Sequence, residues 1–207
     1  MIADIKVPDS TIVRQVEELA RSVSNDVLFN HVMRSYWFGE LFAQQEGKKV
    51  DSELMFLSSV LHDLGLTEYA PGPYRFEIEG AGAARTFLVE QGVSADRAQK
   101  VWDNIALHTW DMNLFRDDTS RLMQIGLAYD VSGARGAKLD PTDVAEVVHR
   151  YPRLNFKRAF NKMLDHEVDS KQPYPHWFHI CSRVEHNRAP LTIVDAPTVL
   201  NWAPFEE

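Results

Sequence analysis

Residues 51–65 read DSELMFLSSVLHDLG, and this segment decides how the chain is interpreted. Asp51 or Ser52 can cap a helix whose apolar residues are spaced three and four apart. The helix leads to the adjacent pair His62-Asp63, and Gly65 then ends it. Burying a carboxylate beside an imidazole costs free energy unless a cation compensates both groups. We therefore expect a divalent metal ion at the end of this helix.

Two further polar residues in apolar surroundings extend this candidate metal site. His31 lies within a predicted helix over residues 26–45, and Asp130 lies in a predicted helix over residues 120–132. Taken singly, such a histidine is more often a core residue, and such an aspartate is more often a cap or a salt-bridge partner. Two imidazoles and two carboxylates together suit Zn, Fe, Mn, Co or Ni better than Ca or Mg. The candidate ligands are His31, His62, Asp63 and Asp130.

The composition indicates one globular domain in a reducing compartment. The 207 residues are 44% hydrophobic and carry a net charge of -8, which argues against a nucleic-acid or anionic-membrane partner. Cys181 is the only cysteine, so no internal disulfide can form. No secretory signal and no apolar run of about 18 residues is present, so we expect a cytoplasmic protein that does not span a membrane.

Helical spacing continues along the chain and predicts an all-α fold. Besides those above, helices are expected over 10–24, from Gly80, over 95–108, over 142–149 and over 154–168, with a last, proline-interrupted one over 172–186. Residues 66–79 and 111–118 are expected to be loops, and the tail from Asn187 is expected to be irregular. We expect one domain over 1–207, with a core at about 25–135 and residues 141–207 packed on it.

The order His31, His62-Asp63, Asp130 on separate helices resembles the HD-domain superfamily of metal-dependent hydrolases, over about residues 25–135. The resemblance implies a helical bundle in which these four residues hold the metal. Four segments are similar to the cyanamide hydratase-like branch, which binds zinc and adds water to a nitrile-type carbon. They are NHVMRSY (30–36), HDLGLT (62–67), RFEIEGA (75–81) and LHT (107–109), and the terminal PFEE (204–207) is also similar.

The chain departs from other HD branches at two points. Many nucleotide phosphohydrolases of the superfamily have a glutamate three positions after the HD aspartate, where this chain has Leu66. Dinuclear members need several histidines between the HD pair and the last aspartate, where this chain has only His108. We therefore expect a single divalent ion, zinc before Fe, Mn, Co or Ni.

Three residues are candidates for proton delivery and orientation beside such an ion. Thr67 follows the HD pair and can donate a hydrogen bond, although a contact at a helix end explains it equally well. Glu77 can turn inward as a proton shuttle, while Glu79 can instead be an acid favoured by a helix N-terminus. His108 follows an apolar segment and is expected to line the pocket or support a ligand.

Four further residues are candidates for substrate binding. Arg34 lies one turn after His31 and can bind an anionic substrate, although neutralising an aspartate is the preferred interpretation. Tyr36, Phe76 and Trp110 can form pocket walls, although most such aromatics belong to a core. The histidines at 176, 179 and 186 are interpreted as part of a lid rather than as a second metal site.

The expected function is that of a metal-dependent hydrolase or hydratase that activates water and acts on a small molecule, most like a cyanamide hydratase. The alternative is an HD phosphohydrolase acting on a nucleotide or another phosphate ester. Arg75, Arg34, Lys48 and Lys49 would then bind phosphate, because the chain has no glycine-rich phosphate loop. A non-catalytic ligand-binding regulator is a third class. Apolar residues of the tail suggest a homo-oligomer.

Overall fold

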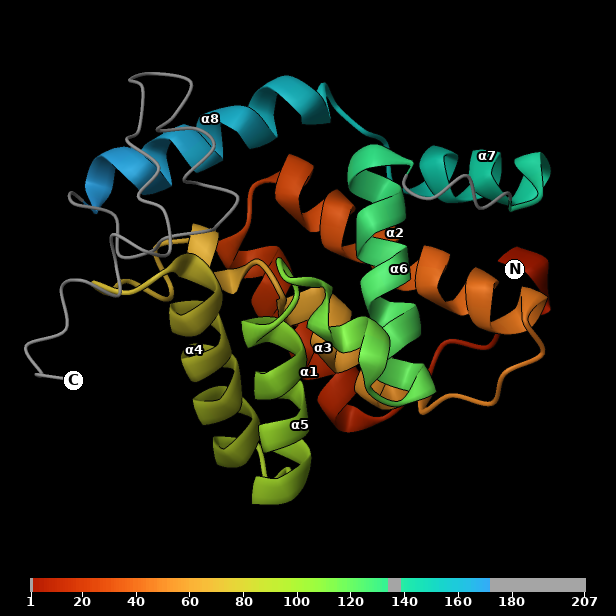
Figure 1. The fold of residues 1–207 in the computed structure, drawn as a ribbon, viewed down its shortest axis with the longest axis horizontal. Coiled ribbons are helices and arrows are strands. Elements are labelled where there is room, and N and C mark those ends of the chain that lie inside the picture. The colour runs from red at the N-terminus through yellow and green to blue at the C-terminus, as the bar shows by residue number, and fades with distance from the viewer. Residues whose placement is uncertain (1, 134–138, 172–207) are drawn as a thin grey trace, which may run out of the picture.

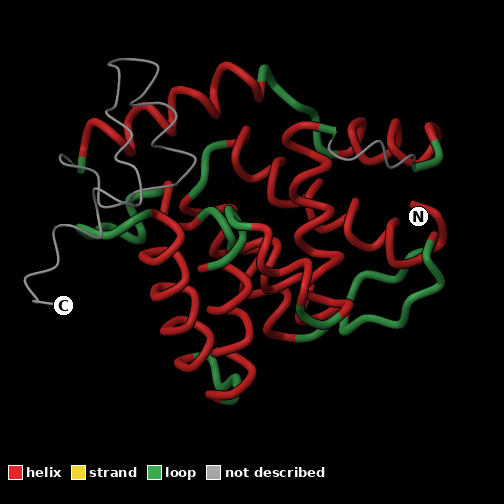
Figure 2. Tube along the Cα trace, in the orientation of Figure 1, coloured by secondary structure: helices red, strands yellow, loops and turns green. Residues whose placement is uncertain are grey.

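The structure is a computed structural model that describes residues 2–133 and 139–171, where helices are joined by loops and no strand occurs (Figures 1 and 2). This confirms the expected all-α fold; the predicted helix over 172–186 and the tail lie outside the described residues. The α-helices are α1 (Thr11–Val23), α2 (Asp26–Gln45), α3 (Ser52–Leu61), α4 (Phe76–Glu90), α5 (Ala95–Ala106), α6 (Asp118–Ser132), α7 (Pro141–Arg150) and α8 (Phe156–Ser170), with short 3-10 helices η1 (Ile2–Asp4), η2 (Leu64–Leu66) and η3 (Asp111–Phe115). Among the described helices, none is both long and apolar enough for a membrane span.

Most of these helices begin where the sequence supplies a capping side chain. Each cap accepts a hydrogen bond from a backbone N–H in the first turn, which satisfies a donor that has no partner inside the helix. The caps are Ser10, Asn25, Asp51, Ser94, Asp117 and Asp140. These capping side chains are visible in the sequence, so the starts of the helices that they cap could be predicted from it.

The expected loops over 66–79 and 111–118 are partly wrong. Helix α4 begins at Phe76 rather than at Gly80, and residues 111–115 form η3. Arg75 occupies the cap position of α4 without a side-chain cap hydrogen bond, so the sequence carries no signal for this start. The first turn is stabilised instead by the packing of Phe76 against residues distant in the sequence and by a local hydrogen bond, in which Glu79 accepts from the backbone N–H of Tyr74.

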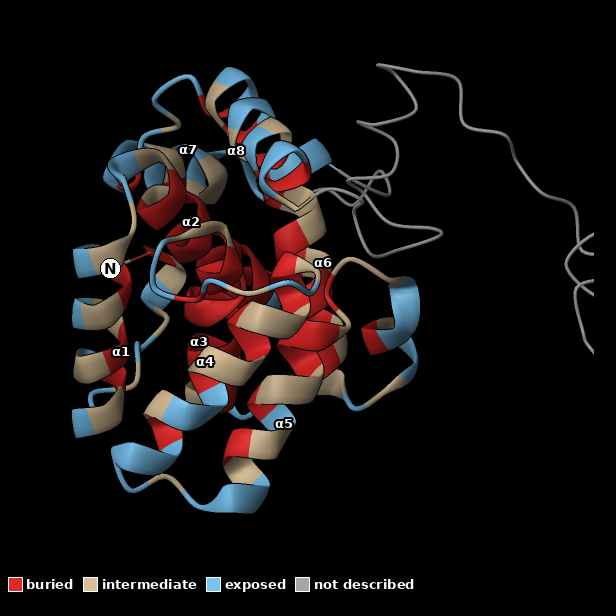
Figure 3. Ribbon diagram, turned by 90° about the vertical axis from the view of Figure 1, so that its left-hand side faces the viewer, coloured by how far each residue is buried: buried red, intermediate tan, exposed pale blue. Residues whose placement is uncertain are grey.

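Helix α2 is the centre of the molecule. All of its residues from 31 to 43 are buried, and α3 and α6 pack against it (Figure 3). The approach of α6 depends on Gly126, where an added Cβ would lie 2.4 Å from the carbonyl oxygen of Ser35 and 2.5 Å from the backbone nitrogen of Gly39. This close crossing brings the middle of α6 next to the middle of α2.

Small residues likewise bring α4 against the chain that follows the HD pair, as its glycine-rich start predicted. An added Cβ at Gly80 would lie 2.7 Å from the backbone nitrogen of Gly65. Helix α8 packs against the N-terminal part of α2 (Figure 1). Residues of α8 form a second apolar cluster with residues of α2 and α4. That cluster contains Leu28, Phe76, Phe156, Phe160, Leu164 and Val168.

Candidate metal centre

Three predicted ligands meet where α2 and the end of α3 come together. His31 is on α2, His62 caps the C-terminus of α3 and Asp63 follows it; all three are buried. The Oδ2 of Asp63 lies 3.5 Å from Nε2 of His31 and 3.1 Å from Nε2 of His62. One donor atom from each residue lies within 4.8 Å of the others, so the group could hold a metal ion.

The donor atoms of this group have the spacing and the unmet bonding capacity that a cation requires. Two ligands about 2.1 Å from a tetrahedral ion are about 3.4 Å apart, close to the separations above. Among the described residues, no hydrogen-bond partner is found for Nε2 of His31 or for either carboxylate oxygen of Asp63. Buried polar atoms without partners are rare and costly, so an ion shared by these atoms fits the site.

The orientation of the imidazoles supports the same conclusion. The Nδ1 of His31 faces the Asp130 carboxylate at 2.7 Å, and the Nδ1 of His62 faces the carbonyl oxygen of Ser59 at 2.7 Å. These acceptors require each Nδ1 to carry a proton, so each neutral imidazole presents the lone pair of Nε2. The two lone pairs point toward an anionic carboxylate, which is favourable only with a proton or a metal ion between them.

His108 lies on the other side of the Asp63 carboxylate. Its Nε2 is 3.6 Å from Oδ1 of Asp63, and its Nδ1 faces the carbonyl oxygen of Ile105 at 2.7 Å. Burial, reinforced by His62, lowers the pKa of His108 to about 4. His108 therefore presents a neutral imidazole beside the three-residue group without belonging to it.

Burial and charge act in opposite directions on the pKa values of the three ligands. Burial lowers the pKa of His31 despite the nearby carboxylates. Burial also acts to lower the pKa of His62, but Asp63 outweighs it and raises that pKa above its usual value. The reverse holds for Asp63. Burial acts to raise its pKa, but the neighbouring histidines outweigh burial and lower it. A proton on His62 thus substitutes for a cation.

Asp130 is held behind His31 and does not belong to the three-residue group. Its carboxylate faces Nδ1 of His31 and accepts hydrogen bonds from Arg34, with Nε at 2.6 Å and Nη2 at 2.8 Å, and from Nη1 of Arg153 at 2.9 Å. Burial would raise the pKa of Asp130, but His31 and Arg34 lower it to about 2. In this geometry Asp130 fixes the tautomer and orientation of His31. Its role as a direct ligand stays a prediction.

A cavity of about 210 Å³ opens beside the group. The described residues that line it are His31, His62, Asp63, Phe76, His108, Thr109, Gln124, Leu127, Ala128, Val131, Ser132, Phe160 and Leu164. Phe76 and His108 therefore lie where the sequence predicted them. Apart from the three-residue group, the described lining is mostly apolar.

The other predicted substrate-binding residues are not among the described residues of this lining. Arg34 is buried and bonded to Asp130 and the carbonyl oxygen of Tyr151, which favours the structural role that the sequence suggested. Tyr36 is buried in the core, with its ring 4.9 Å from that of Phe56. Trp110 instead lies under the guanidinium of Arg75, at 5.7 Å.

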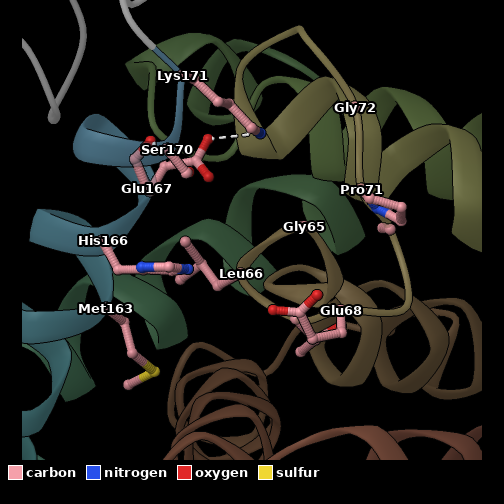
Figure 4. A pocket seen from close by; sticks show the side chains of 12 residues that line it. Gly65, Leu66, Glu68, Pro71, Gly72, Met163, His166, Glu167, Ser170 and Lys171 are labelled. Carbon is pink, nitrogen blue, oxygen red and sulfur yellow. Dashed lines mark hydrogen bonds and ion pairs between the residues drawn. The ribbon is translucent and has the colours of Figure 1, made fainter.

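The two other predicted catalytic residues, Glu77 and Thr67, are not among the residues that line this cavity. Glu77 is buried one layer behind it and accepts a hydrogen bond from the hydroxyl of Thr109. Thr67 lines a different cavity, of about 300 Å³, between the loop after η2 and α8 (Figure 4). Its hydroxyl donates to the carbonyl oxygen of Leu64 at 2.6 Å, which is the helix-end contact considered above.

The segment from Arg153 into α8 contributes to this site in a way that was not predicted from the sequence. The rings of Phe156 and Phe160 lie 4.8 and 5.5 Å from the imidazole of His31, and Leu164 lines the cavity. The spacing of four between these three residues was visible and indicates a buried face. It could not indicate that the face covers His31.

No family model matches the chain, and no curated protein matches it.

Proposed function

We propose that this chain is a metal-dependent hydrolase or hydratase of the HD-domain type, with one divalent ion held by His31, His62 and Asp63. The observation that carries the proposal is the convergence of two Nε2 lone pairs on a buried carboxylate that has no hydrogen-bond partner among the described residues. When bound, such an ion lowers the pKa of a coordinated water and makes it a nucleophile near neutral pH. The nitrogen and oxygen donors suit zinc first, and Fe, Mn, Co or Ni next.

The protein's own groups would orient the reactants and accept protons. His31 is held by Asp130, and His62 by the carbonyl oxygen of Ser59, so neither ring can turn away from the cavity without losing a hydrogen bond. His108 has its Nδ1–H committed to Ile105, which leaves Nε2 as the atom that can take up and return a proton. Phe76 and Phe160 restrict the access of water to these atoms.

The cavity favours a small neutral substrate over a phosphate ester. Its described lining contains no lysine or arginine, and Arg34 is already paired with Asp130. A cavity of about 210 Å³ is below the usual range of about 300–1,000 Å³ for drug-sized ligands. Together with the similarity of four segments to the cyanamide hydratase-like branch, this supports addition of water to a nitrile-type carbon.

Metal analysis combined with a substrate comparison tests the proposal. The purified chain should contain about one equivalent of zinc or a related ion and should convert cyanamide to urea. His62→Gln should lose both the metal and the activity, while His149→Gln, at an exposed histidine of α7, should retain both. Protein that binds no divalent ion would defeat the proposal. Phosphate release from nucleoside monophosphates without urea formation would replace it with phosphohydrolase activity.

A further inference from the structure

The cavity beside the three-residue group is lined by side chains whose donors, except one N–H of Gln124, are bonded to groups outside it. The Nδ1 atoms of its three histidines face Asp130, Ser59 and Ile105, and the hydroxyl of Ser132 donates to the carbonyl oxygen of Ala128 at 3.0 Å. The inward Nε2 atoms of His31 and His108 present lone pairs, and a proton on Nε2 of His62 is directed at Asp63. Cavity-lining atoms with lone pairs and no free proton can bind a cation or a donor, but they cannot donate to a ligand.

Gln124 lines the same cavity and is held at both ends of its amide. Its Nε2 donates to the carbonyl oxygen of His108 at 2.5 Å, and its Oε1 accepts from Nδ2 of Asn113 at 3.2 Å. Within the described lining, the second N–H of this amide is the one side-chain donor for which no acceptor is found. The position of His108 is thereby fixed from its backbone side as well.

Thr109 lines the cavity, and the Glu77 side chain decides whether its hydroxyl can donate a hydrogen bond to a ligand. Its hydroxyl donates its only proton to Oε1 of Glu77, which is completely buried in the first turn of α4. In this pair the carboxylate oxygen is the acceptor, and the first turn of α4 is a helix N-terminus, which favours a negative charge on it. The threonine oxygen is thus left with lone pairs only.

We propose that Thr109, oriented by Glu77, is a specificity-determining residue that accepts a hydrogen bond from an N–H or O–H group of a small neutral ligand in this cavity. The inference rests on the proposed function for its identification of the cavity as the substrate site. The substrate must then carry an amino, amide or hydroxyl donor beside its reacting carbon. A ligand of the same shape with a methyl group there leaves the threonine oxygen without a partner.

Two nearly isosteric probes, acetamide and acetone, test this inference, because they differ in an amino group against a methyl group. Their dissociation constants are measured by NMR titration of the full chain, with and without zinc. The wild type should bind acetamide about 2- to 12-fold more tightly than acetone, the range of one neutral hydrogen bond. Thr109→Val should bring this ratio to about 1, while Thr109→Ser should preserve it.

Glu77→Gln provides an independent test of the same binding ratio. The glutamine amide can donate to the Thr109 oxygen, which turns the hydroxyl proton toward the cavity, so the preference for acetamide should disappear although Thr109 is unchanged. A wild-type ratio retained in Thr109→Val would overturn the inference, as would a ratio lost equally in Thr109→Ser. Failure to bind zinc would contradict the proposed function alone, because the ratio is also measured on metal-free protein.

Discussion

Replacing Asp130 by asparagine removes the negative charge that stabilises Arg34 in the interior. The Arg34 side chain is fully buried, with two nitrogens 2.6 and 2.8 Å from the carboxylate. Breaking a buried pair by removing one partner costs about 3–5 kcal/mol. The lowered pKa of Asp130 points in the same direction: His31 and Arg34 together, acting against burial, lower it from 3.8 to about 2, which corresponds to about 2.4 kcal/mol at about 1.36 kcal/mol per pH unit.

Urea denaturation at pH 7 measures this loss. Asp130→Asn should be about 2–5 kcal/mol less stable than the wild type, which lowers the melting temperature by about 2–4 °C per kcal/mol for a chain of this size. Because the folded-state pKa of Asp130 is lowered, its contribution is complete above about pH 4 and is lost as the pH falls toward 2. The two proteins should therefore converge in stability at low pH.

The matched control is Asp118→Asn, which removes a half-exposed partner of Lys48 and Arg121 and should leave the denaturation midpoint nearly unchanged. A loss below about 1 kcal/mol in Asp130→Asn would refute the buried-pair argument, given the range expected for such pairs. Zinc affinity supplies a second readout. Loss of a group that only orients a metal-binding histidine costs about 10- to 100-fold, and a much larger loss would identify Asp130 as a direct ligand.

Two further predictions concern proton release and close packing. Because Asp63 raises the pKa of His62, a proton must leave that imidazole before zinc binds, so zinc affinity should rise with pH, by up to about tenfold per unit below the raised pKa. Calorimetry in buffers of different ionisation enthalpy measures the released proton, and a pH-independent affinity contradicts the argument. Gly126→Ala should destabilise the fold by about 1–3 kcal/mol or more, since its Cβ would collide with backbone atoms of α2. Gly82→Ala, where nothing lies within 4 Å, should instead be neutral or stabilising in the same thermal melt, and equal effects would show that the α2–α6 crossing can relax.

The helices were largely predictable because their signals are local. A cap such as Asp140 followed by Pro141 marks a helix start within a few residues, and apolar spacing marks the buried face. The start of α4 was missed for the opposite reason. Arg75 is no capping residue, and the turn that begins at Phe76 is stabilised by residues distant in the sequence.

The candidate metal centre was predictable in its chemistry and less so in its surroundings. The adjacent pair His62-Asp63 already indicated a compensating cation, and His31 joins it. Tyr36 lies five residues after His31, which is about 140° around a helix with 3.6 residues per turn, so it faces the core. The aromatic cover from α8 depends on long-range packing, for which one sequence contains no measurable pattern.

The stacking of α8 on His31 has a consequence for biosynthesis. His31 is synthesised as part of α2, near the start of the chain. Phe156 and Phe160, whose rings contact its imidazole, belong to α8 and leave the ribosome after every other described helix. A nascent chain that has emerged only through α6 presents its ligands to bulk solvent, where metals exchange freely. With the proposed ion, we therefore expect stable binding only after α8, the last described helix, has docked on α2.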